Sequence, residues 1–219
     1  MIALIDYGAG NVRSVGKALA AVGAEVVLAR DAATVLAAEK VVLPGVGAFA
    51  DCMESLARLD LIGPIREVVA AGTPFLGICV GMQVLFEYGE ELGGHEGLGL
   101  LSGRVVPFPL PTETMRQQSA EALKVPHTGW NQVEGVVDTP LLVDSPQGAW
   151  AYFNHGFLCR ALPEDTLATT DYGGAFASVV GRGSLFGVQF HPEKSQAVGL
   201  HLLRNFVERV PDALGEARR

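Results

Sequence analysis

The first part of the chain alternates short, wholly apolar runs with segments whose apolar positions recur at helical spacing. Between the first two runs, Val12, Val15, Leu19 and Val22 recur every three or four residues, which predicts a helix that ends at Gly23. Alternating strands and helices are typical of a parallel sheet with helices on both faces. The apolar runs predict four buried strands, at Ile2–Ile5, Val26–Leu28, Val41–Leu43 and Phe75–Ile78.

Further helical patterns lie between and after these strands. Asp31 is expected to cap a short helix that continues to Ala38, because an aspartate at this position accepts a hydrogen bond from a free backbone N–H. Two more helices are predicted around Met53–Ala57 and around Ile65–Val69, and the second is expected to end at Gly72. In sheets of this kind, ligands bind beyond the carboxyl ends of the strands.

The second part of the chain has longer strand patterns separated by turns, which predicts a partly antiparallel arrangement. A final amphipathic helix is expected from about Gln196 to Val210. Pro107–Glu121 contains three prolines and is expected to form an exposed loop. The sequence assigns no function to this loop. We predict one α/β domain over residues 1–210, with a central, mostly parallel sheet flanked by helices and an added antiparallel strand region, followed by a polar tail over 211–219. Strands are predicted at Leu98–Phe108, Lys124–Val137, Trp150–Cys159, Thr166–Tyr172 and Ala175–Phe190.

Composition narrows the class of protein. The chain has 219 residues, 49% of them hydrophobic and 18% charged, with a net charge of −8. A chain of this length builds a core without disulfides, and the negative charge argues against a protein that grips nucleic acid. No apolar run is long enough to span a membrane. The first residues lack the basic start of a signal peptide, so a cytoplasmic protein is expected.

Three cysteines, Cys52, Cys79 and Cys159, are too few and too scattered for a disulfide framework, which favours a reducing compartment. Roles for Cys52 and Cys159 are left open, and packing as small apolar side chains is the simplest interpretation of both. The sequence contains no pattern typical of metal ligands, and neither a metal nor a cofactor is predicted.

The most informative segment is Gly77-Ile78-Cys79-Val80-Gly81, which lies between a buried strand and an apolar helical pattern that runs through Phe86. This is the nucleophile elbow of hydrolases, with cysteine at the reactive position. The turn presents the sulfur at the end of the strand and the start of the helix, where partial positive charge favours thiolate over thiol. The alternative interpretation is a buried, unreactive cysteine.

A thiolate needs a base, and the base needs an orienting group. His191-Pro192-Glu193 follows the last apolar run, so the histidine also lies at the carboxyl end of a predicted strand. Two residues apart in an extended chain, the histidine and the glutamate point to the same side, and the carboxylate can hold one ring nitrogen while the other faces Cys79. A surface His–Glu pair is the alternative.

An oxyanion hole requires backbone N–H groups aimed where negative charge develops. Val80, directly after the elbow cysteine, offers one such group. The second is expected from Pro44-Gly45-Val46-Gly47, which follows a predicted strand. Glycines on both sides of Val46 permit a peptide flip that creates or destroys the hole, and a plain tight turn is the alternative.

Five motifs, taken in their order along the chain, carry a resemblance to a known family. They are Asp6-Tyr7-Gly8-Ala9-Gly10-Asn11, Pro44-Gly45-Val46-Gly47-Ala48-Phe49, Gly77-Ile78-Cys79-Val80-Gly81-Met82-Gln83, Val125-Pro126-His127-Thr128-Gly129-Trp130-Asn131 and Gln189-Phe190-His191-Pro192-Glu193-Lys194-Ser195. Together they resemble the class I (triad) glutamine amidotransferases, and more narrowly the glutaminase subunits of imidazole glycerol phosphate synthase. The resemblance spans residues 2 to about 207 and implies the single-domain fold of that family.

The resemblance implies hydrolysis of glutamine to glutamate and ammonia through a thioester on Cys79, with His191 as acid and base and Glu193 as its orienting carboxylate. It also implies that a carboxylate pairs with the α-ammonium of the substrate, as a buried ammonium requires. Where the family usually has Ser or Thr and then Tyr, this chain has Gly156-Phe157, so backbone contacts are expected there. The implied substrate contacts are Gly45, Gln83, Glu91, His155, Gly156 and Phe157, and Glu91 is the carboxylate.

The resemblance also implies a partner, a (β/α)8-barrel cyclase that forms a heterodimer with this chain and makes imidazole glycerol phosphate and AICAR in histidine biosynthesis. Ammonia would pass to it through a protected channel, since protonated ammonia is not a nucleophile and a dry path preserves the free base. Asn11, Tyr152 and Lys194 match positions near that interface. The family further implies weak glutaminase activity until the partner binds its ligand, with the Val46 peptide as the switch.

Two alternatives stay open. One keeps the chemistry and changes the pathway, as a glutaminase subunit for purines, guanine nucleotides, anthranilate or pyridoxal phosphate. The other is a non-catalytic, flavodoxin-like module with a sensor cysteine, which gives no reason for His191 and Glu193 to accompany Cys79.

Overall fold

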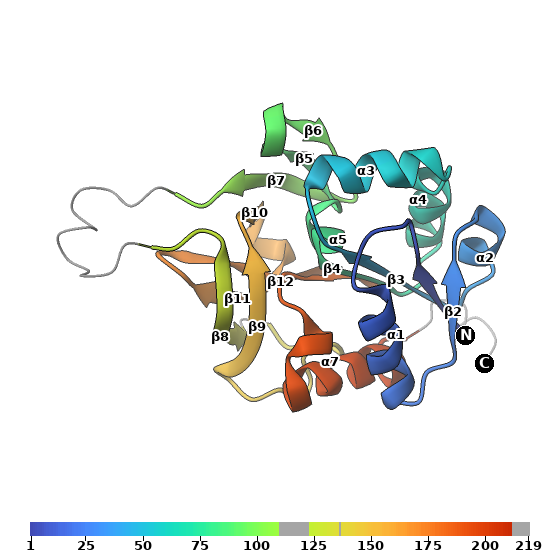
Figure 1. Ribbon diagram of the computed structural model, residues 1–219. Helices are drawn as coiled ribbons and strands as arrows, with labels where there is room; N and C mark the ends of the chain where they lie inside the picture. Colours follow the sequence, from blue (N-terminus) through green and yellow to red (C-terminus); the bar gives the residue numbers. More distant parts are fainter. Residues whose placement is uncertain (110–122, 136, 212–219) are drawn as a thin grey trace.

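The computed structural model describes residues 1–109, 123–135 and 137–211. Within them the main sheet has nine strands, and the five strands on one side of it are parallel (Figure 1). In order across the sheet they are β2 (Val26–Ala29), β1 (Ile2–Ile5), β3 (Lys40–Gly45), β4 (Phe75–Cys79), β13 (Leu185–Val188), β12 (Ala175–Arg182), β11 (Thr166–Asp171), β8 (His127–Gly135) and β9 (Ala149–His155). The predicted class, α/β with a mostly parallel centre and an antiparallel extension, is confirmed.

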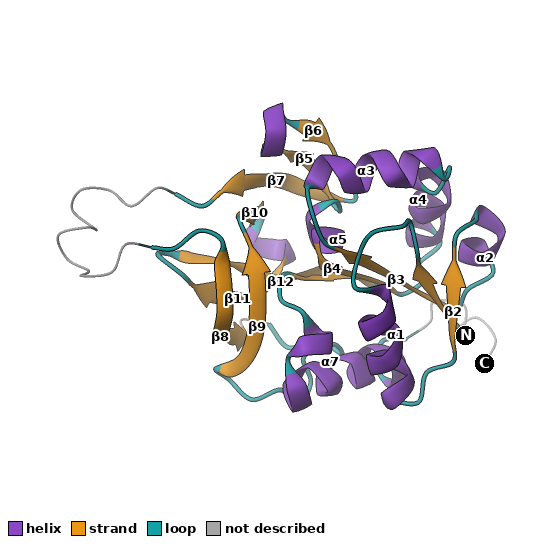
Figure 2. Cartoon of the chain, in the orientation of Figure 1, coloured by secondary structure: helices purple, strands orange, loops and turns teal. Residues whose placement is uncertain are grey.

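Helices cover both faces of the parallel part, as the alternating pattern predicts. Figure 2 shows α1 and α7 on one face and α3 and α4 on the other. Asp31 caps α2 as expected, since its carboxylate accepts a hydrogen bond from the backbone N–H of Thr34. The helices are α1 (Val12–Ala21), α2 (Ala32–Leu36), α3 (Phe49–Arg58), α4 (Ile62–Ala70), α5 (Val80–Gln83) and α7 (Gln196–Glu208), with single turns η1 (Glu91–Gly93), η2 (Pro163–Asp165) and η3 (Pro192–Lys194).

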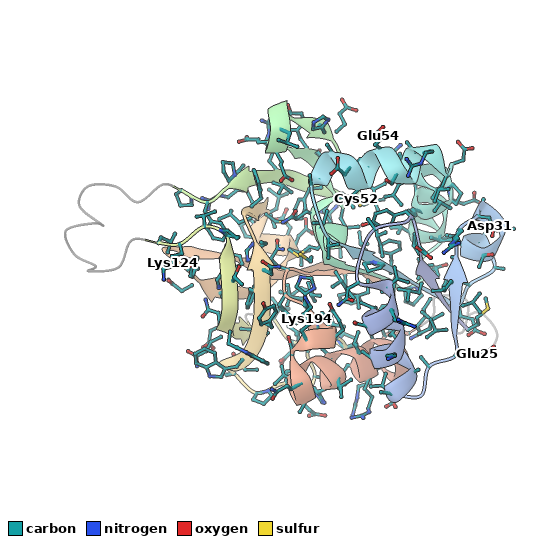
Figure 3. All side chains as sticks on the ribbon, in the orientation of Figure 1. Glu25, Asp31, Cys52, Glu54, Lys124 and Lys194 are labelled. Atoms are coloured by element: carbon teal, nitrogen blue, oxygen red, sulfur yellow. The ribbon has the colours of Figure 1, made fainter. Side chains whose placement is uncertain are left out.

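Apolar spacing explains which face each helix buries. On α3, Phe49, Cys52 and Leu56 recur at helical spacing and are buried against the sheet. Figure 3 shows Cys52 pointing into the protein from α3, whereas Glu54 on the same helix points to solvent. Cys52 is therefore a core side chain with a free thiol, which agrees with the simplest interpretation of its role.

Two of the predicted strands are each divided in the structure. The segment Trp150–Cys159 breaks at Gly156, because the chain leaves the main sheet there and enters a second sheet. The segment Ala175–Phe190 folds back at Gly183–Ser184 into the hairpin of β12 and β13. The prediction of single strands was wrong because the glycine inside each segment, Gly156 and Gly183, marks the point where the chain turns, and an isolated glycine in a strand pattern is equally typical of a bulge.

The helix predicted through Phe86 is also wrong: α5 is a single turn and ends at Gln83. Phe86 instead begins a strand of the second, four-stranded sheet, which the sequence did not predict. Its strands, in order, are β10 (Phe157–Ala161), β7 (Leu101–Pro107), β5 (Phe86–Gly89) and β6 (His95–Glu96). The predicted Pro107–Glu121 loop and the 211–219 tail lie mostly outside the described residues.

None of the helices among the described residues combines the length and the apolar character that a membrane span requires. Over the same residues, no three His, Cys, Asp or Glu side chains gather to hold a metal ion.

Candidate active site

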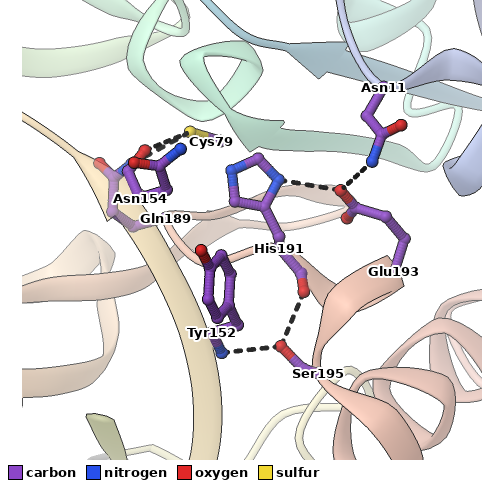
Figure 4. Close-up of polar contacts among 8 residues, drawn as sticks. All are labelled: Asn11, Cys79, Tyr152, Asn154, Gln189, His191, Glu193 and Ser195. Atoms are coloured by element: carbon purple, nitrogen blue, oxygen red, sulfur yellow. Dashed lines mark hydrogen bonds and ion pairs between the residues drawn. The ribbon is translucent and has the colours of Figure 1, made fainter. Parts of the chain in front are cut away.

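The elbow cysteine and the distant histidine lie together at the carboxyl ends of three neighbouring parallel strands. Strand β4 pairs with β3 on one side and with β13 on the other. The register sets Gly45 beside Cys79, and Val188 beside Ile78. Because His191 follows Val188 by three residues, its ring reaches the same edge of the sheet as the sulfur (Figure 4).

The elbow is tight because two backbones touch within it. A Cβ atom on Gly81 would lie 1.9 Å from the carbonyl oxygen of Leu43, and one on Gly77 would lie 2.4 Å from the oxygen of Gly81. The left-handed backbone conformation falls on the cysteine itself, since Cys79 has φ 55° and ψ −111°. A non-glycine residue in this region is strained and persists only where the surrounding structure holds it. Glycine is therefore needed here for close approach rather than for its dihedral freedom.

His191 lies between the sulfur and a carboxylate. Its Nδ1 is 2.9 Å from Oε1 of Glu193, and both side chains are almost wholly buried, at 2% and 0% exposure. Asn11, at the start of α1, donates to the same oxygen over 3.1 Å. The other side of the ring faces the sulfur of Cys79, whose proximity contributes to the raised pKa of His191 (Figure 4). The arrangement is that of a nucleophile, a base and an orienting carboxylate.

The charges of this group support one another. Burial alone lowers the pKa of His191, but hydrogen bonds and negative charge from Cys79 and Glu193 outweigh burial and raise this pKa to about 9. Burial raises the pKa of Glu193, but the hydrogen bonds from His191 and Asn11 outweigh burial and bring this pKa below its usual value. At neutral pH the histidine therefore carries a proton, and the Glu193 carboxylate beside it is ionised.

The backbone of His191 is fixed by Tyr152 and Ser195. The N–H of His191 donates to the carbonyl of Tyr152 over 2.8 Å. The hydroxyl of Ser195 donates to the carbonyl of His191 over 2.7 Å and accepts from the N–H of Tyr152 over 3.0 Å (Figure 4). Ser195 is buried. It belongs to the last of the five motifs and no role was predicted for it, although its position just after His-Pro-Glu could have suggested one.

A cavity of about 220 Å³ opens over the sulfur. Most residues predicted to form the oxyanion hole or bind substrate line it, whereas Gly45 lies beside Cys79 in the strand register. Pro126 and Asn154 also line it. The lining is completed by Val46, Gly47, Cys79, Val80, Gln83, Glu91, His155, Gly156, Phe157 and His191.

Two polar side chains of this lining already have partners. Glu91 accepts a hydrogen bond from the N–H of Phe49 over 2.7 Å, which holds its carboxylate at the edge of the cavity. The amide nitrogen of Gln83 donates to the carbonyl of Phe157 over 3.2 Å and to Oε1 of Gln189 over 3.1 Å. Gln189 was not predicted as a site residue, although it lies two residues before His191.

Two buried histidines lie at the cavity: His155 lines it, and His127 contacts His155 from behind. Nδ1 of His127 lies 3.0 Å from Nε2 of His155, and Nδ1 of His155 lies 2.7 Å from the carbonyl of Phe157. Burial lowers the pKa of His127 to about 4 and that of His155 to about 3. Both rings are therefore neutral at physiological pH and act as fixed hydrogen-bonding groups rather than as charges.

The three residues predicted near a partner surface surround the His–Glu pair. Asn11 reaches Glu193 directly, as described above. The ammonium of Lys194 lies 5.5 Å from the centre of the Tyr152 ring, which is a cation–π distance. Trp130, 44% exposed, meets the same ring edge-on at 6.1 Å.

Comparison with solved structures agrees with this fold. A structure described as a glutamine amidotransferase superposes with a TM-score of 0.72 at 19% identity, over 96% of this chain and 99% of that one. The structure of PurLQS from Thermotoga maritima gives a TM-score of 0.69 at 18% identity, over 96% and 98% of the two chains. At these identities the likeness concerns the fold alone.

Comparison of sequences is more specific. The family model for class-I glutamine amidotransferases matches residues 3–210. The imidazole glycerol phosphate synthase subunit HisH of Salinibacter ruber is 51% identical over 94% of this chain and 93% of its own length. The HisH subunit of Symbiobacterium thermophilum is 47% identical over 97% and 96%. The chain belongs to the class-I glutamine amidotransferases, and within them to the HisH subunits of imidazole glycerol phosphate synthase.

Proposed function

We propose that Cys79, His191 and Glu193 hydrolyse glutamine to glutamate and ammonia in the cavity above the elbow. The observation that carries this proposal is the buried contact series from the sulfur through the imidazole to the carboxylate. The catalytic unit we propose extends over residues 1–210.

In the first half of the reaction, the thiolate of Cys79 attacks the side-chain amide carbon of glutamine. The C=O electrons move to the oxygen, and the oxyanion accepts hydrogen bonds from the N–H of Val80 and from the Val46–Gly47 peptide. When the C–N bond breaks, the proton on His191 goes to the departing nitrogen, and a thioester and ammonia result. The raised pKa of His191 suits this step, since it keeps the ring protonated until the leaving group needs the proton.

In the second half, neutral His191 takes a proton from water, and the hydroxide attacks the thioester carbon. The C–S bond then breaks, which releases glutamate and restores the thiolate. Glu193 stays ionised throughout and holds the tautomer of the ring. Glutamine plus water thus give glutamate plus ammonia.

We assign the amino-acid end of glutamine to the wall of the cavity away from the sulfur. The carboxylate of Glu91, oriented by the N–H of Phe49, pairs with the α-ammonium. Both N–H groups of the Gln83 amide are already engaged, so its oxygen is the atom left for substrate. The backbone of Gly45 and of residues 155–157 supplies the remaining contacts.

We further propose that the ammonia passes to a (β/α)8-barrel cyclase bound as a heterodimer beside Asn11, Tyr152 and Lys194. That cyclase makes imidazole glycerol phosphate and AICAR. Free thiols at Cys52, Cys79 and Cys159 fit a reducing compartment, so the cytoplasm is the location we propose.

The direct test is glutamate release from glutamine by the chain with its cyclase partner. Cys79→Ala is expected to abolish release, and His191→Ala to lower kcat by a factor of about 10² to 10⁴, the usual contribution of acid–base catalysis. Cys159→Ala is the matched control, because it removes a second buried thiol outside the triad. Full activity of Cys79→Ala would refute the proposal.

The partner is tested by product and by activation. Glutamine-dependent formation of imidazole glycerol phosphate is expected with the barrel cyclase, and no transfer is expected to synthases for purines, guanine nucleotides, anthranilate or pyridoxal phosphate. Glutamine turnover is expected to rise when the cyclase binds its ligand, as a flip of the Val46 peptide would produce. Equal turnover with and without the ligand-loaded cyclase would contradict that switch.

A further inference from the structure

The side chain of Gln189 is wholly buried beside the reactive sulfur and has no part in the mechanism above. Its exposure is 0%. The pairing of Val188 with Ile78 brings the next residue of each strand together, so Gln189 meets Cys79. Its backbone N–H donates to the carbonyl of Ser178 on β12 over 2.9 Å, and this hydrogen bond fixes the backbone from which the side chain extends.

The orientation of the Gln189 amide follows from a chain of hydrogen bonds that begins at a backbone carbonyl. The oxygen of Phe157 can only accept, so the group of Gln83 that faces it is the amide nitrogen. The second N–H of that nitrogen then donates to Gln189, so the atom of Gln189 that receives it is Oε1. The thiol of Cys159, 4.0 Å away, also points at this oxygen.

With its oxygen fixed in this way, Gln189 turns its nitrogen to the sulfur of Cys79, at 3.8 Å. The carbonyl of Asn154, 3.9 Å from the same sulfur, is an acceptor and offers nothing to a thiolate. Among the described side chains, the donors brought to the sulfur are therefore the ring of His191 and the amide of Gln189. They differ in one respect, since His191 gives up its proton during the reaction and an amide does not.

We propose that Gln189 is a further catalytic residue, whose amide N–H donates to the sulfur of Cys79 and stabilises the thiolate before attack and again as it leaves the thioester. A hydrogen bond to an ionised acceptor in a buried site is stronger than one between neutral groups. The anchors Gln83 and Phe157 hold the donor in place, so it needs no reorganisation when charge appears. This inference rests on the proposed glutaminase mechanism and adds the group that holds the sulfur's charge when His191 is neutral.

The test measures the thiolate directly, without glutamine. Alkylation of Cys79 by iodoacetamide is followed across pH by peptide mass spectrometry in the complex with the cyclase, for the wild type and for Gln189→Met, which keeps the length and removes the donor. The pH of half-maximal alkylation is expected to rise by about one unit in the variant, which is a tenfold loss of thiolate at a fixed lower pH. The kcat for glutamine is expected to fall about three- to tenfold.

Cys52→Ala is the matched control, because it removes a buried thiol on α3, outside the chain of hydrogen bonds that orients Gln189; its alkylation profile is expected to match the wild type. Gln189→Asn, one methylene shorter, withdraws the donor and serves if Gln189→Met does not fold. An unchanged alkylation midpoint in a folded Gln189 variant would overturn the inference. A shifted midpoint in a protein that releases no glutamate from glutamine would instead count against the glutaminase mechanism and leave the thiolate contact standing.

Discussion

At the scale of single residues, the site depends on how one buried imidazole is held. His191 lies between the sulfur of Cys79 and the carboxylate of Glu193, and its backbone is fixed by hydrogen bonds with Tyr152 and Ser195. Burial disfavours the protonated ring and lowers its pKa, whereas the hydrogen bonds favour the protonated ring and raise its pKa. The usefulness of this histidine therefore depends on its neighbours more than on its own chemistry.

The raised pKa of His191 predicts the alkaline side of the activity profile. The ring loses its proton as pH rises through about 9, and a neutral ring cannot protonate departing ammonia, so glutamine turnover should fall there. Glu193→Gln removes one of the groups that raise this pKa, so the alkaline limb is expected to move to lower pH. The measurement is kcat/KM for glutamine against pH in the cyclase complex. An unmoved limb in Glu193→Gln would show that the carboxylate does not stabilise the charged ring.

Asn11 provides a second prediction at this scale. Its amide donates to Oε1 of Glu193 and helps to lower the pKa of that carboxyl. Asn11→Leu is expected to raise that pKa, to shift the acid limb of the activity profile upward, and to lower kcat/KM about tenfold, as loss of a hydrogen bond to a charged group does. Arg13→Ala, an exposed change on the same helix, is the control. If Asn11→Leu altered only cyclase affinity, the contact with Glu193 would have no catalytic weight.

At the scale of elements, the elbow is a strand end and a single helical turn pressed against the neighbouring strand. The strain at Cys79 is held by the contact of Gly81 with Leu43. The side chain of Cys79 can face the cavity because α5 begins at the next residue, Val80, and turns the backbone away from the strand.

The close approach at Gly81 predicts a large loss of stability on adding one methyl group. Gly81→Ala places a Cβ 1.9 Å from a backbone oxygen that cannot move without disturbing β3, so the free energy of unfolding should fall by about 3 kcal/mol or more. Gly16→Ala is the matched control, since its Cβ would meet only the end of the Leu4 side chain at 3.4 Å, and a change within about 1 kcal/mol is expected. Urea unfolding measures both. Equal stabilities would contradict the packing argument.

At the scale of the whole molecule, the buried histidine pair links stability to pH. His127 is stacked between Phe153 and Tyr172, with ring centres 4.8 and 3.9 Å away, and it contacts His155. Burial lowers the pKa of both histidines in the folded state. The two rings lie opposite each other on the paired strands β8 and β9. Because a buried charge without a partner is costly, protonating either ring destabilises the folded state.

Because the folded pKa values are about 4 and about 3, the unfolded chain binds protons first as pH falls below about 6.5. Stability is therefore full above that pH and is lost on acidification, by about 2 kcal/mol per histidine at pH 5. Urea unfolding at pH 7 and pH 5 measures the loss. His127→Gln keeps an N–H donor without titrating, so a smaller loss between the two pH values is expected. An identical loss in this variant would assign the acid sensitivity to carboxylates.

Local pattern was enough for much of the first half and for the elbow. Apolar runs, helical spacing and the cap at Asp31 are properties of neighbouring residues, and they predicted β1 to β4 and α1 to α4. The same reasoning failed at Gly156 and at Gly183, because an isolated glycine within a strand pattern is typical of a bulge as well as of a turn, and the local pattern does not separate the two.

The sequence by itself determined the chemistry on offer: a cysteine in an elbow, a His-Pro-Glu after a strand, and a chain able to build a parallel sheet. Only the tertiary structure decided which groups surround the sulfur. Gln189 reaches Cys79 through the register of β13 on β4, and Asn11 reaches Glu193 through the packing of α1 beside η3. Register and helix placement are set by how the whole core packs, so no local pattern of residues encodes these contacts.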